Sequence, residues 1–319
     1  SNLSQASNDF CFALLKEFPE SQNVFFSPAS IYIALGMLFA GANSSTANVM
    51  QRVLKYDNVA TNETTVHESF SNAISLLNTA SDEYKLSIAN ALLYQSGFSA
   101  LPEFKDTLVS HYNAFLKEVD FAADDQQAIE EINDWVKNQT RNKITKFLEE
   151  LPPNAVMLLL NAIYFKGTWK KEFDGKYTKN GTFYNGGTDA VTVPMMFTED
   201  VFRTGNFYKQ GFDAIELPYK GGHLGMLIIL PSEDDKLAEV EANLVADDIS
   251  NVISEMYSIK MEVTIPKFKL EDSRQLKRNL SSLGLNELFT EDADFSKING
   301  VQNIVVSEVL HKAAIQVNE

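Results

Sequence analysis

The sequence predicts one large domain in which helices and strands are mixed. The apolar run Val156–Leu160, continued by Ala162–Phe165, has the length of a strand and is typical of a strand buried on both faces in the middle of a sheet. Residues 259–265 alternate apolar and polar side chains, which is typical of a half-buried strand. Residues 3–18 place Phe10, Leu14 and Phe18 at helical spacing.

Composition supports a single globular domain. The 319 residues are 45% hydrophobic and 22% charged, which is enough apolar material for a large core. No linker rich in Pro, Gly or Ser divides the chain, and no internal repeat occurs. The net charge of −16 argues against nucleic acid or an anionic membrane as a partner. No apolar run reaches the roughly 18–20 residues needed to span a bilayer.

In the first half of the chain, helices alternate with a few strands. Ser27 is a candidate N-cap, and Pro28 suits the first position of a helix over residues 31–40 that is apolar almost all round and ends at Gly41. A strand is expected at 86–94, and an edge strand is marked by Leu116, Val119 and Phe121. Further helices are expected at 46–54, 64–79 and 101–112, and another should run from about Ile129 to Lys143.

The second half of the chain is richer in strands. Residues 191–197 form a strand that Pro194 assigns to a sheet edge. Residues 214–219 and 224–230 form a hairpin. Helices are expected at 237–244 and 248–257. Another helix should begin with Ser273 as its N-cap and end at Leu283, where Gly284 stops it. A last strand is expected within 304–317.

Polar residues interrupt two of the buried strands. Asn161 divides the central run, and His311 lies within the last one, which is the only other apolar stretch with a similar interruption. A buried amide without hydrogen-bond partners costs roughly 1–3 kcal/mol. We therefore expect Asn161 and His311 to lie on neighbouring strands, within reach of one another.

No catalytic signature is present. The sequence has no G-x-S-x-G, P-loop or H-E-x-x-H motif, and its four histidines lack the spacing of metal ligands. The single cysteine, Cys11, excludes an intramolecular disulfide and is expected to pack in a helix. Ser27 and Ser30 have two interpretations: plain helix capping, or small side chains that let other backbone approach closely.

Six Asn-x-Ser/Thr sequons are slightly more than chance would give, which indicates a secretory route and glycosylation. They are Asn2, Asn43, Asn62, Asn138, Asn180 and Asn279.

The chain resembles a serpin over nearly its whole length. The motifs that carry the resemblance are collinear: NVFFSPASI (23–31), LGMLFAGA (35–42), NQTRNKITKFL (138–148), LLLNAIYFKGTWKKEF (158–173), VPMMF (193–197), IELPYKGG–LGMLIILP (215–231), VTIPKFKLE (263–271), LGLNELF (283–289) and VLHKAAIQVNE (309–319). The resemblance implies an α+β fold with three β-sheets, one of them a large central sheet, and eight or nine helices.

The resemblance also implies roles for individual residues. Ser27, Ser30, Asn161 and His311 match the residues where the central sheet opens. Trp169, Lys267 and Glu319 match the point where an inserting strand enters. A reactive loop and the last core strands of the single serpin domain, residues 1–319, are expected after Glu319.

The resemblance implies an irreversible inhibitor of serine proteases, with cysteine proteases as the alternative target, and not an enzyme. The cleaved loop would insert between the strands of Asn161 and His311 and trap the acyl-enzyme. The alternative is a non-inhibitory serpin that acts as a carrier or a chaperone-like binding protein, and an enzyme on an α/β scaffold is a third interpretation. We expect a monomer that needs no cofactor and is secreted, although an intracellular member fits too. Heparin activation is not expected, because residues 64–79 contain no Lys or Arg.

The same resemblance predicts a native, stressed state. Its central sheet should have five strands, and the strands of Asn161 and His311 should be direct neighbours.

Overall fold

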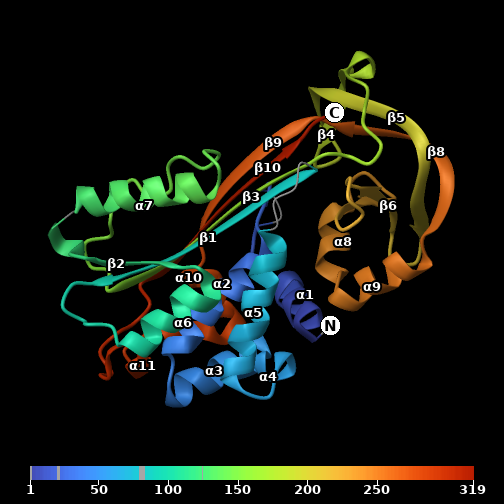
Figure 1. Ribbon diagram of the computed structural model, residues 1–319. Helices are drawn as coiled ribbons and strands as arrows, with labels where there is room; N and C mark the ends of the chain where they lie inside the picture. The colour runs from blue at the N-terminus through green and yellow to red at the C-terminus, as the bar shows by residue number, and fades with distance from the viewer. Residues whose placement is uncertain (1, 20–21, 79–82, 124) are drawn as a thin grey trace.

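The computed structural model describes residues 2–19, 22–78, 83–123 and 125–319 (Figure 1). Most helices gather at one end of the molecule, below the long strands in the view of Figure 1. In the described residues they are α1 (Asn2–Leu15), α2 (Pro28–Gly41), α3 (Ser44–Leu54), α4 (Tyr56–Val59), α5 (Glu63–Leu77), α6 (Pro102–Tyr112), α7 (Gln126–Gln139), α8 (Leu237–Asn243), α9 (Ala246–Glu255), α10 (Lys277–Leu280) and α11 (Ser296–Asn299). Three of them, α4, α10 and α11, have four residues each, and the longer ones agree with the expected eight or nine.

The central sheet has five strands in the order β2-β1-β3-β10-β9. These strands are β1 (Tyr84–Gln95), β2 (Phe115–Val119), β3 (Met157–Gly167), β9 (Phe268–Gln275) and β10 (Glu308–Val317). As predicted, β3 is the middle strand, and its residues 157–164 are all buried. The β1–β3 and β10–β9 pairs are antiparallel, whereas β3 and β10 pair in parallel.

A second sheet contains β4 (Lys179–Asn185), β5 (Asp189–Phe207), β6 (Phe212–Pro218), β7 (Gly225–Pro231) and β8 (Tyr257–Pro266). The long strand β5 holds it together: its first part pairs with β4, its last part with β6, and most of its length with β8. The resemblance implied three sheets. The strands of the described part of the chain form two sheets, because β5 pairs with β4, β6 and β8 within one sheet.

The central sheet is covered on both faces. One face packs on the helical layer around α2, which contributes Ile31, Tyr32 and Leu35 to a core shared with Leu159 of β3. The opposite face packs on α7, whose apolar residues meet the even-numbered residues of β3, such as Leu160 and Ala162. Figure 1 shows α7 alone on its side of the sheet. Burial on both faces explains why β3 reads as an almost continuous apolar run.

One prediction about the edge of a sheet was wrong. Residues 191–197 belong to β5, which has neighbours on both sides and is not an edge strand. Pro194 fits because it pairs with Asn180 of β4 on one side, while the ladder with β8 begins only at Met195. Proline tolerates a place where one ladder stops.

Two helix boundaries also differ from the prediction. Ser273 does not cap a helix: it pairs with Lys312 inside β9, and the short helix α10 begins at Lys277. The distant strand β10 supplies this pairing, so the local cap pattern is overridden. Helix α7 ends at Gln139 and not at Lys143, because Arg141 and Asn142 adopt positive φ angles of 53° and 64°.

A candidate sheet-opening site

The start of helix α2 brings two serines to the central sheet. The Ser27 side chain accepts a hydrogen bond from the Ser30 backbone N–H at 3.4 Å, and Pro28 occupies the first turn, so the predicted cap is confirmed. The Ser30 hydroxyl, 1% exposed, lies 2.9 Å from Asn161 Oδ1. Capping and contact with the sheet are therefore both present, and neither interpretation excludes the other.

Asn161 and His311 are direct neighbours, as predicted. They face each other across the parallel pair β3–β10, and His311 Nδ1 lies 2.7 Å from Asn161 Oδ1. Both side chains are 1% exposed. The polar interruptions of the two strands therefore satisfy one another at the centre of the sheet.

The hydrogen bonds fix the tautomer of His311. The backbone N–H of Ser27 donates to Nε2 at 3.1 Å, so Nε2 accepts and Nδ1 carries the proton that it donates to Asn161. Burial lowers the pKa of His311 to about 4, and Asp272 opposes that shift only in part. The imidazole is therefore neutral at pH 7 and joins α2, β3 and β10 without a buried charge.

The polar network extends further than the sequence predicted. Asn161 Nδ2 donates to Asn90 Oδ1 at 2.7 Å, and Asn90 is its partner in the antiparallel pair β1–β3. The statement that His311 marks the only other polar interruption was wrong, because Asn90 also interrupts a buried strand. Its position in LSIANALLY was the signal that could have found it.

On the other side, His311 pairs with Arg274 of β9. Arg274 binds the Asp272 carboxylate at 3.0 Å and the Asn23 carbonyl at 3.1 Å. The Phe25 backbone N–H also donates to Asp272, at 3.0 Å. A row of polar groups thus crosses four strands and ties them to the segment that leads into α2.

A second group of predicted residues meets where β3 and β10 end. The Trp169 indole N–H donates to the Asn318 carbonyl at 2.7 Å, and the ring is 2% exposed. It stacks on Tyr219, with ring centroids 4.4 Å apart and planes inclined by 11°. A Cβ at Gly167 would collide with the Tyr219 ring, so only glycine lets β3 pass here.

Lys267 and Glu319 form the predicted ion pair, with Nζ and Oε2 2.7 Å apart. The Thr178 hydroxyl donates to the other carboxylate oxygen at 2.9 Å. The Lys267 ammonium, the backbone N–H of Glu319 and the Thr178 hydroxyl together lower the pKa of the Glu319 carboxyl. The end of β10 is therefore held by polar contacts to Lys267, which links β8 to β9, and to Thr178, which directly precedes β4.

The sequence of residues 5–319 matches the family described as Serpin (serine protease inhibitor). The chain is a serpin. It is 39% identical to Iripin-8 of Ixodes ricinus over 99% of this chain and 80% of that protein. It is 38% identical to intracellular coagulation inhibitor 2 of Tachypleus tridentatus, over 100% of this chain and 78% of the relative.

Its fold is that of solved serpins. The structure of uncleaved ovalbumin superposes with a TM-score of 0.92 at 29% identity, over 99% of this chain and 86% of that one. The α+β serpin fold predicted from the resemblance is therefore confirmed. In the described residues, no helix combines the length and the apolar character needed to cross a membrane.

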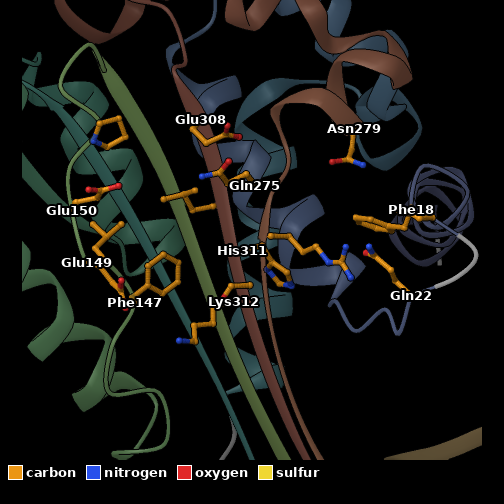
Figure 2. A pocket seen from close by; sticks show the side chains of 16 residues that line it. Phe18, Gln22, Phe147, Glu149, Glu150, Gln275, Asn279, Glu308, His311 and Lys312 are labelled. Carbon is orange, nitrogen blue, oxygen red and sulfur yellow. The ribbon is translucent and has the colours of Figure 1, made fainter.

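A groove runs beside the polar row of this serpin. It has a volume of about 640 Å³ and is lined by β9, β10 and the segments that follow α1 and α7. In Figure 2, His311 lies between Phe147 and Glu149 on one side and Phe18 and Gln22 on the other. The groove therefore lies along β9 and β10, and none of the described residues that line it belongs to β3.

In the described ranges, no group of three or more His, Cys, Asp or Glu is placed to hold a metal ion. Cys11 is half-buried in α1, and burial raises the pKa of its thiol to about 11, so the thiol is protonated and packs as a small apolar group.

The sequons differ in accessibility. Asn2, Asn43, Asn62, Asn138 and Asn180 are exposed. Asn279 is half-buried, and its amide N–H donates to the Glu17 carbonyl at 3.2 Å. Within the Asn138 sequon, Thr140 is buried and its hydroxyl donates to the Val136 carbonyl at 2.8 Å.

Proposed function

We propose that this serpin is an irreversible inhibitor of serine proteases that traps the acyl-enzyme when its cleaved reactive loop enters the central sheet between β3 and β10. The observation that carries the proposal is the direct parallel pairing of these strands from Glu308↔Leu158 to Gln316↔Lys166. A segment that turns back after β10 runs antiparallel to it. Once inserted, that segment would replace one parallel ladder by two antiparallel ones.

The energy of this exchange is sufficient to drive the mechanism. An inserted strand of about ten residues gains about one net hydrogen bond per residue, each about 1 kcal/mol, which gives on the order of 10 kcal/mol before apolar burial. Antiparallel pairing is also slightly more stable per residue than parallel pairing. A displacement of about 1 Å in a protease active site can cost about two orders of magnitude in rate. The gain is therefore large enough to stall deacylation.

Ser27, Ser30, Asn161 and His311 would control how easily the sheet parts at its centre. Their hydrogen bonds hold β3, β10 and α2 together while the sheet is closed. Trp169, Lys267 and Glu319 would control entry, because they meet at the end of β10, where Glu319 stands two residues after Val317. Breaking both groups of contacts before cleavage would favour a polymer or a latent form.

The test is to mix the full-length protein with trypsin-like, chymotrypsin-like and elastase-like proteases and to look for an adduct that survives SDS. The proposal predicts such an adduct with at least one of them, together with a higher melting temperature of the cleaved protein. Cleavage without an adduct and without a gain in melting temperature would instead indicate the non-inhibitory alternative, a carrier or chaperone-like binding protein.

The remaining parts of the proposal concern context. The partner is a serine protease, with a cysteine protease as the alternative, and the protein acts as a monomer without nucleic acid, a membrane or a cofactor. Heparin activation is not part of the proposal, because α5 carries no Lys or Arg. Five exposed sequons support a secreted glycoprotein. Expression in a eukaryotic cell, followed by removal of N-glycans, tests this directly, and an unglycosylated protein retained in the cytosol would contradict it.

A further inference from the structure

Three lysines lie in one row across the central sheet. Lys85 of β1 pairs with Lys166 of β3, Lys166 pairs with Gln316 of β10, and Gln316 pairs with Lys269 of β9. Residues that pair directly share a face of the sheet, so all four side chains project on the same side. This is the face of α7, because Tyr164, two residues before Lys166, belongs to the core that α7 covers. We call these four residues the lysine row.

The lysine row takes no part in the ion pairs formed among the described residues. Among the residues that the structure describes, Lys85, Lys166 and Lys269 form no ion pair, although the protein has 43 acidic and 27 basic residues. The nearest acid on the same face of β9, Glu271, binds Lys312 at 2.9 Å instead. Like charges placed directly opposite each other on neighbouring strands are destabilising, and Lys85 and Lys166 are placed in this way.

A fourth cation and an unpaired donor lie beside the row. Lys143, from the segment after α7, places its ammonium 5.8 Å from the centre of the Tyr164 ring. The Tyr164 hydroxyl is buried and has no hydrogen-bond partner in the described part of the chain. A buried hydroxyl left in this state costs free energy. The row therefore offers surface ammonium groups, while the Tyr164 hydroxyl, two residues before Lys166 on the same face of β3, is an unsatisfied donor that is closed to solvent in this state.

We infer that the lysine row is a binding site for a small polyvalent oxyanion of the oligophosphate class. The Cα atoms of Lys85 and Lys166 are separated by one strand spacing and those of Lys166 and Lys269 by two, which is about 5 Å and about 10 Å. Lysine side chains span such distances and bind phosphate oxygens as point charges. The net charge of −16 disfavours a long polyanion, whereas a compact anion contacts less of the acidic surface around the row.

The position of the row links the site to sheet opening, and this consequence rests on the proposed function. Lys166 and Lys269 lie on opposite sides of the β3–β10 boundary. A strand inserted there would move them apart by about another 5 Å. An anion that bridges both lysines therefore binds the closed sheet more tightly, and a ligand that prefers one state shifts the population toward it. The bound anion would slow loop insertion.

Binding is tested by calorimetric titration of the purified full-length protein with inorganic tripolyphosphate at low salt, with inorganic monophosphate as the comparison. We expect saturable binding of one tripolyphosphate, at least tenfold tighter than that of monophosphate. Lys166→Gln and Lys269→Gln should each weaken tripolyphosphate binding about tenfold. The matched control is Lys105→Gln, an exposed lysine of α6 that forms no ion pair with the described residues, and it should bind as the wild type does.

Absence of saturable binding, or equal weakening by Lys105→Gln, would overturn the site. The link to insertion has its own readout: the rate of protease inhibition should fall at saturating tripolyphosphate, and Lys269→Gln should lose this effect. If tripolyphosphate binds tightly but the rate of protease inhibition does not change, the effect on loop insertion is refuted, while the binding site itself is supported. A protein that binds tripolyphosphate but traps no protease would contradict the proposed function alone.

Discussion

Replacing Asn161 by Ala removes the centre of the polar row. Three groups lose their partner: the Ser30 hydroxyl, the His311 Nδ1–H and the Asn90 side-chain carbonyl. A buried group left unsatisfied costs about 1–3 kcal/mol. Ser30 can turn to the Ser27 carbonyl, 3.3 Å away, which removes part of the loss. We therefore expect Asn161→Ala to reduce the free energy of unfolding by about 3–5 kcal/mol.

The assay is urea unfolding, in which the first transition is followed because serpin unfolding need not be two-state. Asn180→Ala, on an exposed position of β4, is the matched control and should change stability by less than about 0.5 kcal/mol. A double-mutant cycle with His311→Ala should give a coupling energy of about 1 kcal/mol or more. We also expect faster polymerisation of Asn161→Ala on warming. Additive effects, or a loss as small as that of the control, would refute this account of the polar row.

Four further predictions follow from the same contacts. His311 has a pKa near 4 when folded and about 6.5 when unfolded, so its contribution is fully present above pH 6.5 and is lost as the pH falls toward 4. Between pH 7 and pH 4, the free energy of unfolding measured in urea should fall by about 3 kcal/mol more for the wild type than for His311→Gln. An equal dependence of this free energy on pH in both proteins would contradict the prediction. Glu319→Lys breaks the pair with Lys267, which is worth at most about 1 kcal/mol, and should speed polymerisation on warming, as measured by size exclusion. In a Trp135→Phe background, the emission of buried Trp169 should shift to longer wavelength when the bond to Asn318 is disturbed by cleavage, and a constant spectrum would argue against movement at the entry point. Asn90→Ala should destabilise by about 1–2 kcal/mol, less than Asn161→Ala, since Asn90 Oδ1 accepts one bond of the network.

The sequence predicted those parts of the fold in which local pattern and tertiary structure agree. The continuous apolar run placed β3 in the middle of the sheet, and Ser27 with Pro28 marked the start of α2. Asn161 and His311 could be paired in advance because a buried polar group needs a partner. The resemblance, and not the local pattern, brought Trp169, Lys267 and Glu319 together.

The errors arose where distant segments decide local structure. Ser273 has the local features of a helix cap, but β10 pairs with it and extends β9. Pro194 alone indicates an edge strand. In the structure it pairs only with β4, because the ladder between β5 and β8 begins one residue later, at Met195. Asn90 was not predicted to belong to the polar row, because a single polar residue within an apolar strand does not show by itself which residue it faces. Only the register shows that it faces Asn161.

The central claim is that β3 and β10 must part for this serpin to work. Lys166→Cys together with Gln316→Cys places two thiols at directly paired positions of these strands, and Lys85→Cys together with Lys166→Cys does the same for β1 and β3, which need not separate. The measurement is the yield of the SDS-stable protease adduct before and after reduction. We expect that the oxidised β3–β10 pair forms no adduct and regains it on reduction, while the oxidised β1–β3 pair forms it throughout. An adduct formed while β3 and β10 are locked together would contradict the claim.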